Sequence, residues 1–307
     1  MRLGIQARLS GQTGNVIDDL LEHARVTERH GLDLWIGQGL DVDSVTALTI
    51  AAREAPALSV GVSVVPAYSR HPVNTAVQAL TAQAATGGRF TLGVGVSHQI
   101  MVEGVYGISY TKQLRQMREY LEILMPLLHG HQIDYTGEVF SAHTTRSPVA
   151  VPGATPPRVL VAAMGTRMLE LTGQLADGTT LWMVGPKTLA DHVVPTITKA
   201  ADAADRPTPE VMAGLTVCVT SDPDTARAVA GREFAIYKSL PAYQAMFERE
   251  GAGGAEDLTV VGDEEQVAEQ IRRLEDLGAT SAMFAVYGTD EEQHRTLALL
   301  SELARSN

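Results

Sequence analysis

The 307-residue sequence predicts a (β/α)8 barrel, and two observations carry this prediction. Runs of Val, Leu, Ile and Ala recur without polar alternation, which is typical of parallel strands covered on both faces. Most of these runs are followed by a segment whose apolar residues have helical spacing. A doubly wound sheet, divided near residues 150–157, is the alternative. We prefer the barrel because eight strand–helix units close a barrel in a chain of this length, with room for an insertion.

The first four strand–helix units are expected within residues 2–130. The segment 14–31 has apolar residues near one helical face and ends at Gly31. The segment 71–88 has a proline near its start and a Gly-Gly pair at its end, which are helix start and stop signals. Strands are predicted at 2–9, 32–37, 58–66 and 89–96, and helices at 14–31, 43–55, 71–88 and 111–130.

Residues 131–157 interrupt this alternation and are predicted to be an insertion after the fourth strand–helix unit. The stretch IDYTGEVFSAH has a Thr-Gly turn between two strand-like runs, which predicts a hairpin, and VPGATPP is a proline-rich connector. We therefore interpret residues 1–307 as a single barrel domain with one insertion. Further strands are predicted at 158–164, 179–184, 211–219 and 281–288, and further helices at 166–176, 187–204, 223–239, 263–277 and 290–304.

Composition and charge limit the possible functions. The formal net charge of −12 argues against binding the phosphates of a nucleic acid. No run of about 18 apolar residues predicts a membrane span, and no signal-like leader precedes the first strand. The single cysteine, Cys218, is expected to be buried in an apolar strand, and a chain with one cysteine suits a reducing cytoplasm. His129 and His131 are too few ligands to predict a metal site.

The carboxyl ends of the strands are where a (β/α)8 barrel carries its chemistry. Gly95, Ser97 and His98 follow the fourth strand. Their spacing lacks the third glycine of a dinucleotide-binding loop, and no helix is expected directly after them. A histidine at this place can donate or accept a proton near neutral pH, and an ordinary loop histidine is the alternative.

Two further groups of residues follow other strands. Gly165 and Thr166 lie between a strand and a helix, where free backbone N–H groups bind phosphate, or where Thr166 merely caps the helix. Tyr68, Tyr106 and Tyr110 are expected to wall the mouth of the barrel, with internal packing as the alternative.

Three charged residues are interpreted as structural. Arg70 precedes a helix and is expected to form an ion pair or to tether the backbone. Glu119 and Glu122 lie on one predicted helix and are expected to face solvent or to form ion pairs.

The chain resembles the luciferase-like family of barrel oxidoreductases, and most closely its actinobacterial branch that uses the deazaflavin coenzyme F420. Segments that carry the resemblance run through nearly the whole chain in the family's order: WIGQ (35–38), GVSVVPAYSRHP (61–72), ATGGRFTLGVGVSH (85–98), YTGEVF (135–140), VPGATPPRVLVAAMG (151–165) and LADGTTLWMVGP (175–186). The resemblance implies a (β/α)8 barrel with an insertion. It also implies a non-proline cis peptide at Ser63-Val64 that forms a bulge behind the deazaflavin ring.

The resemblance further implies which residues contact the cofactor. Its phosphate is expected at Gly165-Thr166. An Asp-His pair that the family often carries after the second strand is replaced here by Gln38-Gly39, which removes a familiar catalytic histidine and argues against a sugar-phosphate substrate. The residues expected to contact the cofactor are Gln38, Ser63, Val64, Gly95, Ser97, Ala163, Met164, Gly165, Thr166, Trp182 and Met183.

The function implied is transfer of a hydride between deazaflavin C5 and a small organic substrate, by reduction of a C=C or C=N bond or by oxidation of an alcohol. His98 is expected to manage the proton, and a neutral, partly apolar or aromatic substrate is expected between the tyrosines and Trp182. An FMN-dependent monooxygenase and a non-catalytic F420 carrier are the alternatives. The family often forms dimers, so we expect a cytoplasmic homodimer.

Overall fold

The computed structural model describes residues 1–9 and 14–306. Within them, parallel strands form one sheet in the order β10-β9-β11-β1-β2-β3-β4-β7-β8, and β8 pairs again with β9. The sheet therefore closes on itself, and β10 only extends one side of β9. The predicted (β/α)8 barrel is confirmed. The barrel strands are β1 (Arg2–Gln6), β2 (Asp33–Ile36), β3 (Val60–Pro66), β4 (Phe90–Gly95), β7 (Arg158–Ala162), β8 (Gly178–Thr180), β9 (Glu210–Val219) and β11 (Ser281–Val286), and the added strand is β10 (Val260–Gly262).

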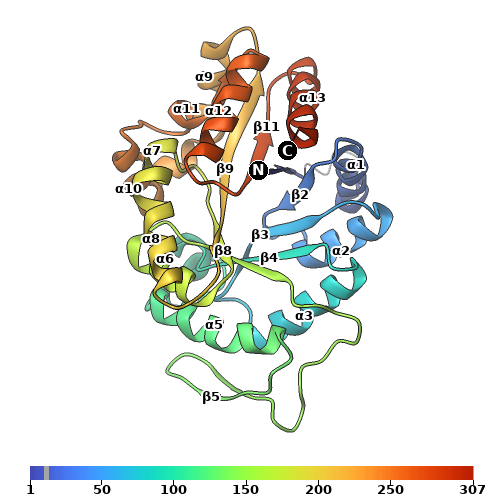
Figure 1. The fold of residues 1–307 in the computed structure, drawn as a ribbon, viewed down its shortest axis with the longest axis vertical. Helices are drawn as coiled ribbons and strands as arrows, with labels where there is room; N and C mark the ends of the chain where they lie inside the picture. The colour runs from blue at the N-terminus through green and yellow to red at the C-terminus, as the bar shows by residue number, and fades with distance from the viewer. Residues whose placement is uncertain (10–13, 307) are drawn as a thin grey trace.

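Helices surround the barrel on its outside, with α1 to α3 on one side, α6 and α8 on the opposite side, and α12 and α13 beside the two chain ends (Figure 1). The described helices are α1 (Val16–Arg29), α2 (Ser44–Glu54), α3 (Pro72–Ala85), α4 (Gln99–Gly104), α5 (Gln113–Leu128), α6 (Thr166–Leu175), α7 (Pro186–Thr188), the π-helical turn η1 (Leu189–Val193), α8 (Val194–Asp202), α9 (Pro223–Glu233), the 3-10 helix η2 (Ala235–Ser239), α10 (Pro241–Glu250), α11 (Ala255–Leu258), α12 (Glu264–Asp276) and α13 (Asp290–Arg305).

Several elements differ from the prediction. A short helix, α4, begins directly after His98, where no helix was expected, and α10, α11 and β10 were not predicted. The helix predicted at 223–239 is divided at Phe234 into α9 and η2. The strand predicted at 179–184 ends at Thr180, although the amides of Leu181 and Met183 still donate to β9 carbonyls at 2.9 Å. The unpredicted elements have 3 to 10 residues, too few for a helical or strand period to be evident.

The bore of the barrel is filled mainly by Trp35, and glycines on the neighbouring strands make this possible. A Cβ at Gly4 would lie 2.9 Å from the Trp35 ring, and one at Gly61 would lie 2.2 Å from it. Trp35 packs with Met212 and Met283 in a cluster separate from the main core between strands and helices. The lower bore is thus solid, so ligands can enter only above this cluster.

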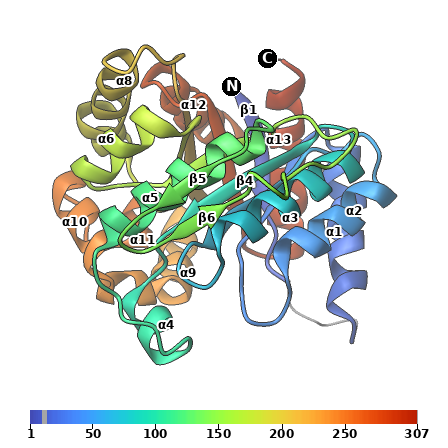
Figure 2. The ribbon, with the colours of Figure 1, turned by 90° about the horizontal axis from the view of Figure 1, so that it is seen from below.

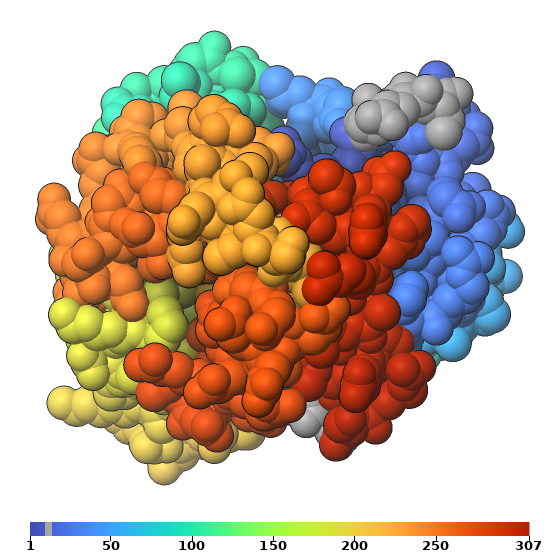
Figure 3. Space-filling model, turned by 90° about the horizontal axis from the view of Figure 1, so that it is seen from above, coloured from blue at the N-terminus to red at the C-terminus, as the bar shows by residue number. Residues whose placement is uncertain are grey.

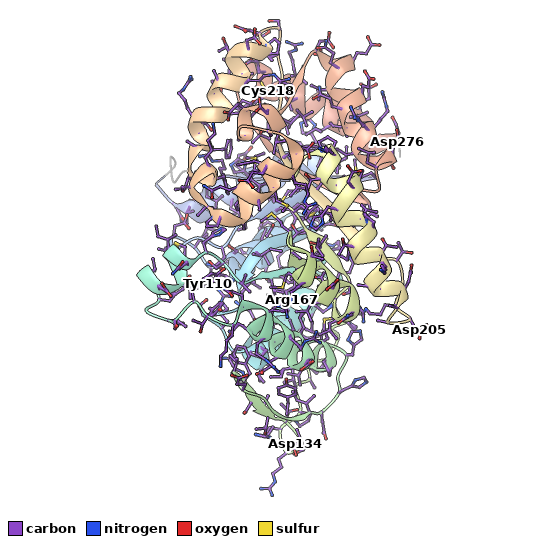
Figure 4. The ribbon with its side chains drawn as sticks, turned by 90° about the vertical axis from the view of Figure 1, so that its left-hand side faces the viewer. Tyr110, Asp134, Arg167, Asp205, Cys218 and Asp276 are labelled. Atoms are coloured by element: carbon purple, nitrogen blue, oxygen red, sulfur yellow. The ribbon has the colours of Figure 1, made fainter. Side chains whose placement is uncertain are left out.

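The insertion between α5 and β7 contains a hairpin of β5 (Asp134–Thr136) and β6 (Ser141–His143), which lies at the far end of the molecule from the chain termini (Figures 1 and 4). Glu119 of α5 is 1% exposed, and its carboxylate accepts the amides of Glu138, Val139 and Phe140 at 2.7–3.0 Å. Burial acts to raise the pKa of Glu119, but these hydrogen bonds and Arg115 outweigh it and lower the pKa. The expected ion pair of Glu119 is confirmed, because Arg115 Nη1 lies 4.0 Å from its Oε1, but the alternative that Glu119 faces solvent was wrong. Its carboxylate also anchors the turn of the hairpin.

The two chain ends lie side by side, as Figures 1 and 2 agree, because β1 pairs with β11. Seen from above, the C-terminal helices cover the centre of one face and the N-terminal helices flank them (Figure 3). Figure 2 shows α4 projecting from the body of the barrel. Among the described residues, no helix is both long enough and apolar enough to cross a membrane.

Candidate active site at the carboxyl end of the barrel

The two glycines of TLGVGVSH make room for a bulge in the neighbouring strand. A Cβ at Gly93 would lie 2.1 Å from the Val62 carbonyl oxygen, and one at Gly95 would lie 2.8 Å from Val64 Cγ2. The Ser63-Val64 peptide bond is cis, so this implication of the resemblance is confirmed, and the register between β3 and β4 shifts at the same place. Gly93 and Gly95 therefore admit the Val64 side chain, and this stretch is not a nucleotide-binding loop.

The turn between β7 and α6 presents a helix N-terminus to open space. Gly165 is the N-cap of α6 and Thr166 is its first residue, so the alternative that Thr166 caps the helix was wrong. Gly165 has φ −79° and ψ 147°, which any residue adopts, and nothing lies within 4 Å of a Cβ placed there. The fold itself therefore does not require glycine at this position. Arg167 follows in the first turn of the helix (Figure 4).

Two side chains that the sequence did not single out hold this turn. His192, 6% exposed in the π-helical turn η1, donates from Nε2 to the Met164 carbonyl at 2.8 Å. Thr179 of β8 donates to the Ala163 carbonyl at 3.2 Å. Ala163 is itself 1% exposed, so only its backbone is open to a ligand. Met183, which was expected to contact the cofactor, is fully buried in the main core and its backbone is left-handed with φ 53°.

Gln38 uses all of its hydrogen-bonding capacity on the protein. Its Oε1 accepts the Ser44 amide at 3.1 Å and Arg70 Nη2 at 3.0 Å. Its Nε2 donates to the carbonyls of Gly39 and Val42, both at 2.9 Å. The side chain therefore shapes the β2–α2 loop, and it has no unused donor or acceptor for a cofactor. The predicted contact between Gln38 and the cofactor stays a prediction, and such a contact would be of the van der Waals kind.

Arg70 is a structural tether, as predicted. It forms an ion pair with the Asp43 carboxylate, and its Nη1 donates to Gln78 Oε1 at 2.8 Å. Burial acts to raise the pKa of Asp43, but the Thr46 amide and Arg70 outweigh it and lower the pKa. Beside this network lies an open surface cavity of about 310 Å³. The cavity is lined by Gln38, Gly39, Leu40, Asp41, Val42, Asp43, Ser69, Arg70 and Tyr106.

Three buried polar atoms at the mouth have no partner among the described residues. They are Gln6 Oε1, Trp182 Nε1 and Thr216 Oγ1. Gln6 lies two residues beyond Gly4 and Thr216 two beyond Gly214, so both share the bore-facing side of their strands. A Cβ at Gly214 would lie 2.9 Å from Trp182, so this ring lies over the bore as well. Buried polar atoms are normally satisfied by protein groups or by ordered water, so an ordered water or a ligand atom is expected at these three.

Ser63 connects the bulge to the facing strand, because its hydroxyl lies 3.1 Å from that of Thr180 in β8. The structure thus brings the bulge, Thr180 and the residues after β8 together at the mouth. Ser63 and Val64 are half-buried, and Gly95 is buried beneath them. These residues form the floor of the candidate site.

His98 stands at the rim of the mouth, as the N-cap of α4, but its side chain makes no capping hydrogen bond. It is half-buried, its ring centroid lies 5.9 Å from that of Tyr243, and burial lowers its pKa from the ordinary 6.5. The imidazole is therefore mainly neutral at pH 7. A neutral imidazole accepts a proton readily, and it becomes a donor only after protonation.

The three tyrosines predicted to wall the mouth do not form one group. Tyr68 and Tyr110 pack with ring centroids 5.4 Å apart, and their hydroxyls donate to the carbonyls of Thr111 and Ser97 at 2.6 and 2.9 Å. Ser97 has a left-handed backbone, with φ 61°, which turns the chain from β4 toward α4. Tyr106 instead lines the cavity beside Gln38.

A second aromatic group, missed in the sequence, comes from the segment after β9. Phe234 and Tyr237 lie 6.1 and 6.3 Å from the Trp182 ring, and Tyr243 lies 4.7 Å from Tyr237. Burial raises the pKa of the Tyr237 phenol, and the Trp182 indole offsets part of that rise, although indole Nε1 reaches no hydrogen-bond partner among the described residues. FAIYKS (234–239) was included in the helix predicted at 223–239 and LPAYQ (240–244) was left without a prediction, so only the three aromatic residues could have signalled a wall.

Other features do not contribute to the site. Cys218 is buried, as predicted, and burial raises its pKa to about 11. In the described part of the chain, no group of three or more His, Cys, Asp or Glu side chains is arranged to hold a metal ion. A second cavity of about 320 Å³ lies outside the barrel wall, between α10, β10 and α12, and includes Arg227, Glu250 and Arg273.

Known proteins resemble this chain over most of its length. The 5,10-methylenetetrahydromethanopterin reductase of Archaeoglobus fulgidus is 29% identical over 217 residues, which are 69% of this chain and 64% of that protein. The structure of the coenzyme F420-dependent tetrahydromethanopterin reductase of Methanopyrus kandleri superposes with a TM-score of 0.81 at 21% identity, covering 98% of this chain and 97% of that one. A type II Baeyer–Villiger monooxygenase of Pseudomonas putida, solved with FMN, superposes with a TM-score of 0.77 at 15% identity, covering 100% and 98%.

The two structural likenesses support the fold, and the family follows from the sequence. The model of the luciferase-like monooxygenase family matches residues 2–281, which include every barrel strand from β1 to β9, the added strand β10 and the first residue of β11. With its closed barrel and its bulge at Ser63-Val64, this chain belongs to the luciferase-like monooxygenase family of oxidoreductases.

Proposed function

We propose that this protein is an F420-dependent oxidoreductase that transfers a hydride between the deazaflavin and a small organic substrate. The relatives named above include an F420-dependent reductase with the same fold. The observation that carries the proposal is Gly165, a glycine that the fold does not need, at a helix N-terminus facing open space. Glycine there serves a ligand, because it lets a phosphate approach the backbone N–H groups.

The residues at the mouth fit such a cofactor. The amides at the start of α6 would hold its phosphate, and the bulge at Ser63-Val64 would support its ring system. The unpartnered Gln6 Oε1, Trp182 Nε1 and Thr216 Oγ1 offer an acceptor, a donor and a hydroxyl to the polar edges of a ring. F420, when bound, supplies a hydride donor or acceptor at C5.

His98 manages the proton in this proposal. In alcohol oxidation, its neutral imidazole accepts the hydroxyl proton of the substrate. In the reduction of a C=C or C=N bond, the protonated imidazole donates a proton to the product. Its place at the rim, beside Tyr243, lets it contact a molecule in the mouth and exchange protons with solvent.

An FMN-dependent monooxygenase is the second candidate, because the fold is shared with a monooxygenase that binds FMN. The test is a pair of assays on the purified protein. Reduced F420 with a panel of enones, imines and ketones, without oxygen, is expected to be oxidised in a substrate-dependent way. Oxygen consumption with reduced FMN and no turnover of F420 would assign the protein to the monooxygenases. F420 binding without turnover in the whole panel would indicate a carrier.

A homodimer and a cytoplasmic location stay predictions.

Gly165→Ala tests the phosphate end of this site directly. The methyl group has free space and a compatible backbone, so stability should be unchanged or higher by up to about 1 kcal/mol. F420 affinity should fall about tenfold, because the methyl group occupies the approach to the α6 amides. Gly104→Ala is the matched control, since nothing lies within 4 Å of a Cβ there either, and it should leave affinity unchanged. If Gly165→Ala and the wild type had equal F420 affinity, the phosphate would bind at a place other than the α6 amides.

A further inference from the structure

The segment 234–243 lies across the mouth of the barrel. Its first residue, Phe234, packs under the Arg8 guanidinium beyond β1, at 5.5 Å from the ring centroid. It also contacts Trp182 beyond β8, at 6.1 Å. Its far end, Tyr243, contacts His98 beyond β4, at 5.9 Å. One segment therefore reaches the carboxyl ends of three strands that are not neighbours in the barrel.

The rings of this segment form a continuous surface with Trp182. Phe234 and Tyr237 are stacked with an interplanar angle of 28°, and Tyr237 meets Tyr243 edge to face at 4.7 Å. We call Trp182, Phe234, Tyr237 and Tyr243 the aromatic wall. Trp182 and Tyr237 are half-buried, so parts of their rings stay accessible, whereas Phe234 and Tyr243 are buried in the main core behind them. Such a surface stabilises flat apolar molecules by ring stacking and by burial of apolar area.

Charge is balanced at the aromatic wall. Arg8 is the cation that the described contacts place against one of its rings, and Arg8 is paired with Glu233 at 2.7 Å. Lys238, within the same segment, is paired with Glu256. No charge is left over among these groups to neutralise an ionised substrate, and burying an unpaired carboxylate against rings is costly. The group open to hydrogen bonding beside the wall, the His98 imidazole, is half-buried and makes no capping hydrogen bond.

We propose that the substrate is an uncharged, planar, conjugated or aromatic carbonyl compound that stacks on the accessible rings of the aromatic wall, and that Tyr237 is a specificity-determining residue. The buried Tyr243 joins the wall to His98, so a carbonyl group near the imidazole places the rest of a flat molecule against the Tyr237 ring. This inference rests on the proposed function in one respect: the substrate shares the mouth with the cofactor.

Three probes of matched structure test the substrate class. Benzylideneacetone is a neutral conjugated ketone with a phenyl ring, cinnamate has the same skeleton with a carboxylate, and 3-penten-2-one lacks the ring. Their dissociation constants are measured by calorimetry on the protein alone and on the protein saturated with F420. Benzylideneacetone is expected to bind at least about tenfold tighter than 3-penten-2-one and about 100-fold tighter than cinnamate. Equal or tighter binding of cinnamate, or no effect of removing the ring, would overturn the proposal.

Substitutions locate the effect on the wall. Tyr237→Ala, at a half-buried position, should weaken benzylideneacetone about tenfold and leave 3-penten-2-one nearly unchanged, whereas Tyr237→Phe keeps the ring and should retain the preference. Tyr243→Ala removes the buried ring that supports Tyr237 and should weaken the preference in the same direction. Tyr135→Ala removes a ring from the insertion hairpin and is the control, with no expected change. If Tyr243→Ala and Tyr237→Ala both keep the wild-type preference, the wall does not hold the substrate.

The inference and the proposed function fail in different ways. If the protein binds no F420 but keeps the probe preference, the proposed cofactor is wrong and the proposed role of the aromatic wall stands. If the protein binds and turns over F420 but prefers cinnamate, the proposed role of the aromatic wall is wrong and the proposed cofactor stands.

Discussion

The two sides of the barrel mouth differ in how their polar groups are satisfied. On the side of β2 and β3, Gln38, Arg70, Asp43 and Gln78 bind one another and the backbone, and Gln38 has no unused donor or acceptor. On β1, β9 and the segment after β8, three polar atoms are buried without a partner among the described residues, and one of them is Nε1 of Trp182 in the aromatic wall. Because buried polar atoms without partners cost stability, the second side is arranged for a ligand and the first for the fold.

This difference reverses an expectation from the sequence. Gln38 occupies the place of a familiar catalytic pair, so it was the natural candidate for contact with the deazaflavin head. The structure instead commits it to the β2–α2 loop. The unsatisfied groups are Gln6, Trp182 and Thr216, of which only Trp182 was singled out. The unsatisfied polar groups are therefore those of Trp182, which was expected to contact the cofactor, and of Gln6 and Thr216, which were not.

The largest expected effect is at His98, the proton-transfer group beside the aromatic wall. His98→Gln should lower turnover about 100-fold, the typical contribution of general acid–base catalysis, with F420 affinity unchanged. Because burial lowers the pKa of His98 below 6.5, wild-type alcohol oxidation should slow as pH falls through that pKa, and reduction should slow as pH rises through it. The variant should lose this inflection. A pH–rate profile in each direction provides the measurement, and an unchanged profile in His98→Gln would remove the residue from the mechanism.

Arg70→Leu removes the central donor of the hydrogen-bond network around Gln38 and should lower the free energy of unfolding. It leaves Asp43, Gln38 and Gln78 without their shared donor, which costs about 2 kcal/mol of unfolding free energy. Arg53→Leu is the control, because among the described residues Arg53 makes one long hydrogen bond, at 3.5 Å, and the variant should change stability by less than about 0.5 kcal/mol. Denaturant unfolding of the three proteins measures the difference. Equal stability of both variants would mean that the network does not support the fold.

Trp182→Phe tests the side of the mouth with unpartnered polar atoms. Of the three variants, it is expected to change the stability of the free protein least. It removes an unpartnered N–H and keeps an aromatic ring, so stability should change by less than about 1 kcal/mol. F420 affinity should fall about tenfold if this N–H binds the cofactor. The same denaturant and fluorescence titrations measure both quantities. If Trp182→Phe lost as much stability as Arg70→Leu and kept normal F420 affinity, the polar groups on both sides of the mouth would serve the fold.

The barrel could be predicted from the sequence because apolar strands and amphipathic helices have local periods. Gly31 and the Gly-Gly pair at 87–88 also mark helix ends. The bulge at Ser63-Val64 was available only through the family resemblance. Contacts between distant segments could not be predicted: Glu119 binds amides 19 to 21 residues away, and His98 meets Tyr243 across the barrel mouth. Short helices such as α4 and α10 contain too few residues for a periodic signal, so the aromatic wall on η2 and α10 was missed.

The central claim is that the mouth holds F420, and an equilibrium fluorescence titration of the purified protein with F420 and, separately, with FMN tests it most directly. We predict that F420 binds with a dissociation constant of about one micromolar or tighter, and at least about tenfold tighter than FMN. Tighter binding of FMN, or binding of neither, would contradict the claim.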